Sequence, residues 1–216
     1  MIDMDNILFL HGWGGNERSF ASVLPFFEGK YNCVCVYLPT EPGEVWTLED
    51  YADTVLCELD KRGIQKAHII AHSFGARVAV LLVGRQPERF GKLVLTGPAG
   101  LRPRLSIIRR LKIRLHKAGL VKGRGSADYR ILSPTGKKTF QNVVNRDLSA
   151  EIARIGHSIL IIWGDKDDAV KKYMINRWTK LACRVTIKVY KGCGHFCFLD
   201  KAARFILDTE EFLNAF

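Results

Sequence analysis

Short apolar runs alternate with segments of helical periodicity along most of this chain, and this alternation constrains the fold more than any other feature. Strands separated by helices build βαβ units, and these units form a parallel sheet with helices on both faces. The fold class is therefore α/β. We predict about six strands, at residues 6–10, 32–37, 67–72, 92–96, 158–163 and 184–190.

The segments between these runs have the length and periodicity of helices. Thr47 is expected to start one of them, because Thr47 and Asp50 are spaced like the two partners of a capping box. A closing helix is marked by apolar residues between positions 205 and 216. The other predicted helices cover residues 16–27, 48–59, 74–85 and 173–181.

The alternation stops between residues 101 and 155. Apolar residues recur there every three or four positions, which indicates an amphipathic helix. Its apolar stripe consists of Leu105, Ile108, Leu111, Leu115 and Ala118. Ser133-Pro134 is a typical start for a second helix, which we expect to reach Val144. We predict a helical cap over residues 101–155, inserted into a core made of residues 1–100 and 156–216.

The length and the cysteines favour one cytoplasmic domain. A chain of 216 residues can bury a single large core, and none of its apolar runs approaches the roughly 20 residues of a membrane span. The six cysteines are expected to be reduced thiols. Cys193, His195 and Cys197 are close in sequence, but zinc needs four ligands and no Cys-x-x-Cys pair completes a site. We expect no metal and no cofactor.

The positive charge of the chain is concentrated in one segment. The formal net charge is +11, and eleven lysines and arginines with no acidic residue lie between Arg89 and Ala127. A localised block on an otherwise neutral protein indicates one face that meets an anion, whereas a nucleic-acid partner is not expected. Arg109, Arg110 and Arg114 are candidates to bind an anionic substrate; alternatively, they form the solvated face of the cap helix.

Reactive side chains and glycines follow several of the predicted strands. In parallel sheets the ligand site lies beyond the carboxyl ends of the strands, so these residues should meet at one edge. A serine, a histidine and a carboxylate are the groups that acyl transfer uses, and a glycine-rich loop can supply N–H groups for an oxyanion. The stretches are His11-Gly12-Trp13-Gly14-Gly15, Ala71-His72-Ser73-Phe74-Gly75, Gly164-Asp165-Lys166-Asp167-Asp168 and Gly192-Cys193-Gly194-His195-Phe196.

These four stretches, in this order, resemble the alpha/beta-hydrolase family over nearly the whole chain. The resemblance implies that Ser73 is a nucleophile, His195 its base and Asp167 the acid. It also implies that the backbone N–H groups of Trp13 and Phe74 form an oxyanion hole.

The choice of Asp167 over Asp165 and Asp168 also follows from the resemblance, because the family's acid stands three residues after the glycine. His11 is expected to shape the oxyanion turn, and His72 to be structural with its side chain directed away from Ser73.

Two features depart from the family pattern. Ala71 stands where the serine turn normally has its first glycine, and alanine is small enough to be tolerated. The first predicted strand also leads directly into the oxyanion loop, so the two antiparallel strands that open the family's sheet are expected to be missing. The Trp-containing loop and the small basic cap are similar to those of carrier-protein methyl ester esterases.

Three functions are compatible with these residues. The first is hydrolysis of a carboxylic ester or thioester through an acyl-enzyme, with a small acyl substrate that is neutral, anionic or carrier-linked. The second is hydrolysis of a carbon–carbon bond on the same residues, and the third is noncatalytic ligand binding or docking. Ser73 argues against dehalogenase and epoxide hydrolase chemistry, for which family members carry an aspartate. The sequence leaves open whether the protein forms a homo-oligomer.

Overall fold

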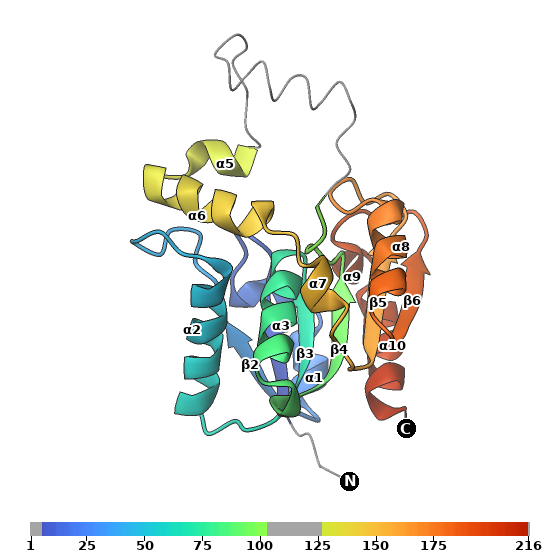
Figure 1. The fold of residues 1–216 in the computed structure, drawn as a ribbon. Helices are drawn as coiled ribbons and strands as arrows, with labels where there is room; N and C mark the ends of the chain where they lie inside the picture. The colour runs from blue at the N-terminus through green and yellow to red at the C-terminus, as the bar shows by residue number, and fades with distance from the viewer. Residues whose placement is uncertain (1–5, 103–126, 216) are drawn as a thin grey trace.

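The structure is a computed structural model, which describes residues 6–102 and 127–215 (Figure 1). The six strands form one sheet in the order β2-β1-β3-β4-β5-β6, and every pairing is parallel. This confirms the predicted α/β fold with its parallel six-stranded sheet. The strands are β1 (Asn6–Leu10), β2 (Asn32–Val36), β3 (Ala67–His72), β4 (Phe90–Thr96), β5 (Ile159–Gly164) and β6 (Val185–Tyr190).

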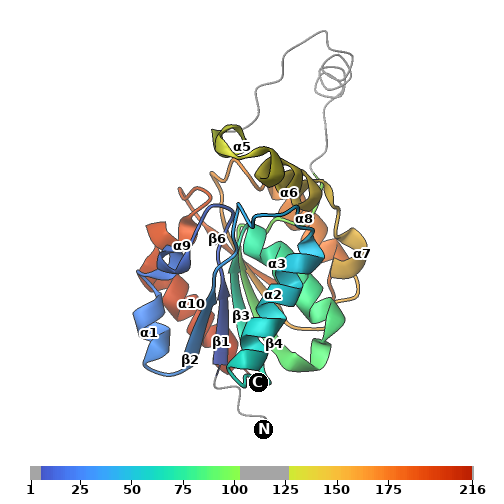
Figure 2. The same ribbon diagram turned by 90° about the vertical axis from the view of Figure 1, so that its left-hand side faces the viewer.

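Helices cover both faces of the sheet (Figure 2). Helices α1 (Leu24–Glu28), α9 (Cys197–Asp200) and α10 (Ala202–Asn214) lie on one face. Helices α2 (Leu48–Lys61), α3 (Phe74–Arg85), α7 (Ser149–Ile152) and α8 (Lys172–Leu181) lie on the other. The remaining elements are α5 (Ala127–Ile131), α6 (Pro134–Asn145) and the 3-10 turns η1 (Glu17–Phe20) and η2 (Pro87–Arg89).

The sheet separates two apolar cores because successive side chains of a strand point to opposite faces. In β1, Leu8 and Leu10 belong to the core beneath α2 and α3, whereas Ile7 and Phe9 belong to the core beneath α1, α9 and α10. All four side chains are fully buried. Burial on both faces explains why this strand is a continuous apolar run without alternation.

The predicted helix over residues 16–27 is wrong as a single element. Asn16 caps the 3-10 turn η1, and α1 begins only at Leu24. Pro25 stands in the first turn of α1. Proline has no backbone N–H to donate and clashes with the preceding turn, so a continuous helix through position 25 is disfavoured. The predicted cap of α2 is confirmed, with Thr47 and Asp50 bonding each other's backbone N–H groups.

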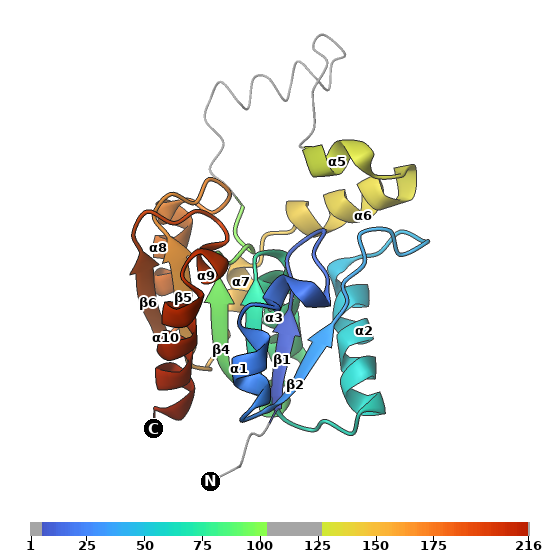
Figure 3. The same ribbon diagram turned by 180° about the vertical axis from the view of Figure 1, so that it is seen from behind.

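The strand order places a topological switch point between β1 and β3. The chain leaves β1 towards β2 on one side, and β3 then pairs with β1 on the other. Loops that leave two neighbouring strands in opposite directions open a crevice at the carboxyl edge. The loop after β1 and the turn at Ser73 after β3 border this switch point, and α5 and α6 lie across the same end of the sheet (Figure 3). Among the described helices, none has the length and apolar character of a membrane span.

Candidate active site

Ser73 occupies a strained turn between β3 and α3. Its φ of 49° and ψ of −106° make it the only non-glycine residue with positive φ in residues 6–102 and 127–215. Such a conformation costs on the order of 1–3 kcal/mol and persists only where its surroundings hold it. Here the Ser73 N–H donates to the Thr96 carbonyl at 3.0 Å, and its own carbonyl accepts from the N–H groups of Ala76 and Ala99 at 3.2 Å each.

Two small residues make this turn possible. A Cβ added to Gly75 would lie 2.2 Å from the carbonyl oxygen of Leu10, so the start of α3 can approach the end of β1 only through a glycine. Ala71, two residues before the serine, is fully buried and fits without a glycine. The departure from the usual sequence of this turn is thus accommodated, while the second glycine is required by close approach.

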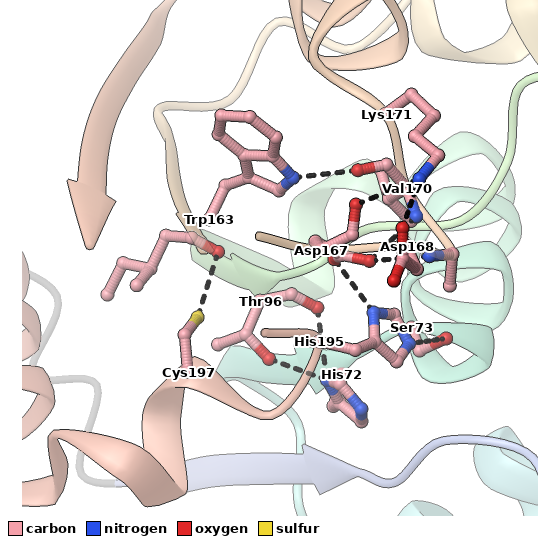
Figure 4. A network of polar contacts seen from close by, with 12 residues as sticks. His72, Ser73, Thr96, Trp163, Asp167, Asp168, Val170, Lys171, His195 and Cys197 are labelled. Atoms are coloured by element: carbon pink, nitrogen blue, oxygen red, sulfur yellow. Dashed lines mark hydrogen bonds and ion pairs between the residues drawn. The ribbon is translucent and has the colours of Figure 1, made fainter. Parts of the chain in front are cut away.

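Ser73, His195 and Asp167 form one line of hydrogen bonds (Figure 4). His195 Nδ1 donates to Asp167 Oδ2 at 2.8 Å, and His195 Nε2 lies 2.9 Å from Ser73 Oγ. With the proton of the neutral ring on Nδ1, Nε2 is free to accept the proton of the serine hydroxyl. The three groups come from loops that are 94 and 28 residues apart along the chain, and the sheet edge brings them together.

Asp167 is held ionised and in place by the loop around it. Its Oδ1 accepts from the N–H groups of Ala169 and Val170 at 2.8 Å each, which leaves Oδ2 for His195. Burial alone would raise the pKa of this carboxyl, but the hydrogen bonds from His195, Val170 and Ala169 outweigh it and hold the pKa below its usual value.

The other two candidate acids lie elsewhere. Asp165 accepts from the Gly192 N–H at 2.7 Å, and Asp168 is fully exposed and pairs with Lys171. Of the three aspartates in this loop, Asp167 is therefore the one brought to His195. Asp165 instead ties the loop after β5 to the loop that carries His195.

Two further glycines make room for the acid–base pair. A Cβ at Gly97, which has a φ of +48°, would lie 3.0 Å from His195 Nδ1 and 3.1 Å from Asp167 Oδ2. A Cβ at Gly164 would lie 2.3 Å from the carbonyl oxygens of Cys193 and Gly194. Gly97 directly follows β4, and a glycine at the carboxyl end of a parallel strand is the sequence signal that links it to this edge.

His72 lies beside His195 and is kept neutral. Its ring centroid is 4.8 Å from that of His195, and its Nδ1 is 2.8 Å from Thr96 Oγ1. Burial lowers the pKa of His72 to about 3, and the nearby His195 acts in the same direction. The expected structural role fits these contacts, but the packing of the His72 ring against His195 was not foreseen from the sequence.

The loop after β1 passes close to Ser73. His11 Nε2 accepts from the Leu38 N–H at 2.9 Å, so Nδ1 carries the proton and donates to the Gly12 carbonyl at 2.7 Å. The position of a Cβ on Gly12 would be 3.5 Å from Ser73 Cβ. Hydrogen bonds from His11 thus shape this turn, as expected, and hold it against the serine.

Trp13 and Phe74, the two residues expected to donate N–H groups to an oxyanion, are neighbours at this edge of the sheet. Their ring centroids are 5.2 Å apart in an edge-to-face arrangement. The Trp13 ring also contacts Phe140 of α6 at 5.1 Å, and the Phe74 ring contacts Tyr51 at 5.0 Å. Aromatic side chains therefore wall the Trp13 side of the site.

Arg109, Arg110 and Arg114, the candidates to bind an anionic substrate, lie outside the described residues. A cavity of about 380 Å³ lies along the second half of α3, beside Val80, Gly84, Arg154 and Ile155, and none of Ser73, Asp167 and His195 lines it. Within the described part of the chain, no three His, Cys, Asp or Glu side chains come together as a metal site would require.

The family model of the alpha/beta hydrolase family matches residues 7–208. The chain belongs to the alpha/beta-hydrolase family. This hydrolase is 25% identical over 257 residues to 2-hydroxy-6-oxo-6-phenylhexa-2,4-dienoate hydrolase of Comamonas testosteroni. The alignment covers 96% of this chain and 87% of that protein.

A second relative is an esterase. Strigolactone esterase D14 of Arabidopsis thaliana is 35% identical over 104 residues, which cover 43% of this chain and 39% of the esterase. Among solved structures, carboxylesterase CesB from Bacillus subtilis superposes with a TM-score of 0.72 at 18% identity, covering 99% of this chain and 85% of that one. The chain is therefore similar to proteins that are named esterases and to one that is named a dienoate hydrolase.

Proposed function

We propose that this alpha/beta hydrolase is a serine hydrolase that cleaves a carboxylic ester or thioester through an acyl-enzyme. The observation that carries the proposal is the hydrogen-bonded line from Ser73 through His195 to Asp167, with distances of 2.9 and 2.8 Å. A serine hydroxyl is a weak nucleophile until a base removes its proton, and a neutral imidazole oriented by a carboxylate is suited to that task.

The steps follow from the atoms in place. Ser73 Oγ attacks the carbonyl carbon of the substrate while its proton passes to His195 Nε2. Asp167 stabilises the imidazolium that forms, through the bond from His195 Nδ1. The proton then goes to the leaving alcohol or thiol, and a water activated by His195 releases the acid. The N–H groups of Trp13 and Phe74 stabilise the negative oxygen of both tetrahedral intermediates.

A second candidate is hydrolysis of a carbon–carbon bond on the same residues. It is supported by the similarity to 2-hydroxy-6-oxo-6-phenylhexa-2,4-dienoate hydrolase, which extends over 96% of this chain. Assays with that dienoate and with esters and thioesters of different acyl length and charge separate the two reactions. A kcat/KM for the dienoate well above that for every ester would replace the first proposal by the second.

A fluorophosphonate probe tests the nucleophile directly. Wild-type protein should be labelled covalently, and Ser73→Ala should abolish labelling without loss of the folded state. Ser22→Ala, which changes an exposed serine outside the site, is the matched control and should be labelled like the wild type. A folded wild type that takes up no label would contradict the serine hydrolase and favour a noncatalytic binding protein.

A further inference from the structure

Helix α6 (Pro134–Asn145), the roof helix, is fastened at its C-terminal end by a buried arginine of α3. The Arg77 Nη1 donates to the carbonyl oxygens of Val143 and Arg146 at 2.8 Å each, and its Nη2 donates to that of Val144 at 3.3 Å. The last carbonyls of a helix have no partner within the helix, so this guanidinium satisfies the groups that would otherwise be left open. Arg77 is only 5% exposed.

The N-terminal end of the roof helix meets a carboxylate. Glu41, in the loop between β2 and α2, accepts from both the backbone N–H and the hydroxyl of Ser133. A Cβ added to Gly136 would lie 2.6 Å from Glu41 Oε1, so this glycine lets the carboxylate approach the first turn. A negative group at the start of a helix and a positive group at its end both interact favourably with the helix dipole. The roof helix is thus held at each end by a group whose charge is opposite to the partial charge of that helix end.

Burying the charged guanidinium of Arg77 at this position costs free energy, because the charge loses contact with water. Burial lowers the pKa of Arg77 to about 10, which reflects the cost of removing its charge from water. Within the described part of the chain, its three hydrogen bonds all go to backbone carbonyls of residues 143–146. An apolar side chain could pack between α3 and α6 without this cost, but it would not fix the helix end at one position relative to α3.

The roof helix leads back to the proposed oxyanion hole. Arg77 stands four residues after Ser73, one turn along the same helix. The ring of Phe140, in the middle of the roof helix, packs on Trp13 at 5.1 Å, and Trp13 packs on Phe74 at 5.2 Å. A continuous series of contacts therefore links the two ends of the site. It leads from Ser73 along α3 to Arg77 and the roof helix, and from Phe140 of the roof helix through Trp13 to Phe74.

We infer that Arg77 is a positioning residue, which holds the roof helix in register with the nucleophile helix and, through Phe140, sets the position of Trp13. This inference rests on the proposed function, because the Trp13 N–H is one of the two proposed oxyanion donors. An oxyanion donor displaced by a fraction of an ångström stabilises the transition state less, while binding of a small substrate changes little.

Hydrogen exchange tests whether the Arg77 hydrogen bonds, here called the clamp, hold the end of the roof helix, and it does not require enzyme activity. In Arg77→Met, amides of residues 134–145 should exchange at least about tenfold faster, while those of β3 and β1 keep their protection. Arg85→Met is the matched control, because Arg85 lies on the same helix and pairs with Asp53, away from the roof helix. Its exchange pattern should match the wild type. Unchanged exchange over residues 134–145 in Arg77→Met would overturn the inference.

Kinetics test the link to the oxyanion hole. With a short-chain neutral ester, Arg77→Met should lower kcat about tenfold with KM within twofold of the wild type. Arg77→Lys should recover part of the loss, because an ammonium can reach one or two of the three carbonyls. An unchanged kcat in Arg77→Met despite faster exchange of the roof helix would refute the positioning role.

Phe140→Ala tests the contact between the roof helix and Trp13 separately from the Arg77 hydrogen bonds. It also replaces Arg77→Met as the test variant if Arg77→Met does not fold. It removes the ring that contacts Trp13 and leaves Arg77 and Glu41 in place, so kcat should fall as in Arg77→Met while the helix ends stay protected. An unchanged kcat would overturn the inference. A wild type without turnover or fluorophosphonate labelling would instead contradict the proposed function, and the exchange experiment would still decide the clamp.

Discussion

The edge of the sheet and the roof helix are held in different ways. At the edge, backbone approaches backbone so closely that glycine is required, as at Gly75 beside Leu10 and at Gly164 beside Cys193. The roof helix is held by side-chain ends, mainly Arg77, Glu41 and the Phe140 ring. Backbone contacts tolerate almost no displacement, whereas long side chains can adapt. Changes at the edge should therefore abolish function or folding, and changes in the roof should tune it.

Removing a reacting group at the edge should have the largest effect. Ser73→Ala and His195→Ala should each lower kcat for an ester by about 10⁴-fold or more, because nucleophile and base act as one unit. The double variant should be little worse than either single variant. Turnover by the purified single and double variants measures this. Losses that multiply in the double variant would show that the two residues act independently.

A methyl group placed at the closest backbone contact should have the next largest effect. Gly75→Ala puts a Cβ 2.2 Å from the Leu10 carbonyl oxygen, and we expect about 3 kcal/mol of lost stability. Gly84→Ala, on the same helix with nothing within 4 Å of the new Cβ, should instead stabilise by about 0.5 kcal/mol. Urea unfolding of both variants compares them. Equal effects would mean that the contact at Leu10 relaxes easily.

The buried histidines should make the protein sensitive to acid. Burial lowers the pKa of His72 to about 3 and of His68 to about 4, whereas an unfolded histidine titrates near 6.5. Between these values the unfolded chain binds protons that the folded chain does not. The contribution of His72 and His68 to the free energy of unfolding is complete above about pH 6.5. It is lost as pH falls, by up to about 1.4 kcal/mol per pH unit for each histidine.

Urea unfolding at pH 7, 6 and 5 measures this loss. His68 accepts from the Lys92 N–H at 2.9 Å through Nδ1, and His68→Gln can keep an acceptor there without a group that titrates in this range. The variant should show a shallower dependence of stability on pH than the wild type. Identical slopes would show that His68 binds protons equally in the folded and unfolded states, which would contradict the lowered pKa.

The smallest effect is expected from the basic segment that precedes α5. Replacing Arg109, Arg110 and Arg114 by glutamine should raise the KM of an anionic ester about fivefold and leave a neutral short-chain ester unchanged. The effect should weaken at high salt, because exposed charges are screened. Steady-state kinetics with a matched pair of charged and neutral esters measures it. An equal loss for both esters would indicate damaged packing and remove the proposed role of these arginines.

The four inner strands β1, β3, β4 and β5 could be predicted because they are buried on both faces over most of their length and therefore appear as continuous apolar runs. The residues after the strands could be assigned to one edge because parallel strands end on the same side of the sheet. The prediction of one helix over residues 16–27 is wrong because apolar periodicity continues through Pro25, where the helix cannot continue. The start of α2 was predicted well, because Thr47 and Asp50 interact locally.

Sequence patterns are enough to predict the order of strands and helices, the polar residues at the strand ends and the small residues of the serine turn. These properties depend on local periodicity and on steric limits at single positions. The packed structure is needed to show that Asp167 contacts His195 while Asp165 and Asp168 bind other groups, that His72 packs on His195, and that Arg77 binds the end of the roof helix. Such contacts join residues from separate elements, and they depend on distances that emerge only when the helices pack on the sheet.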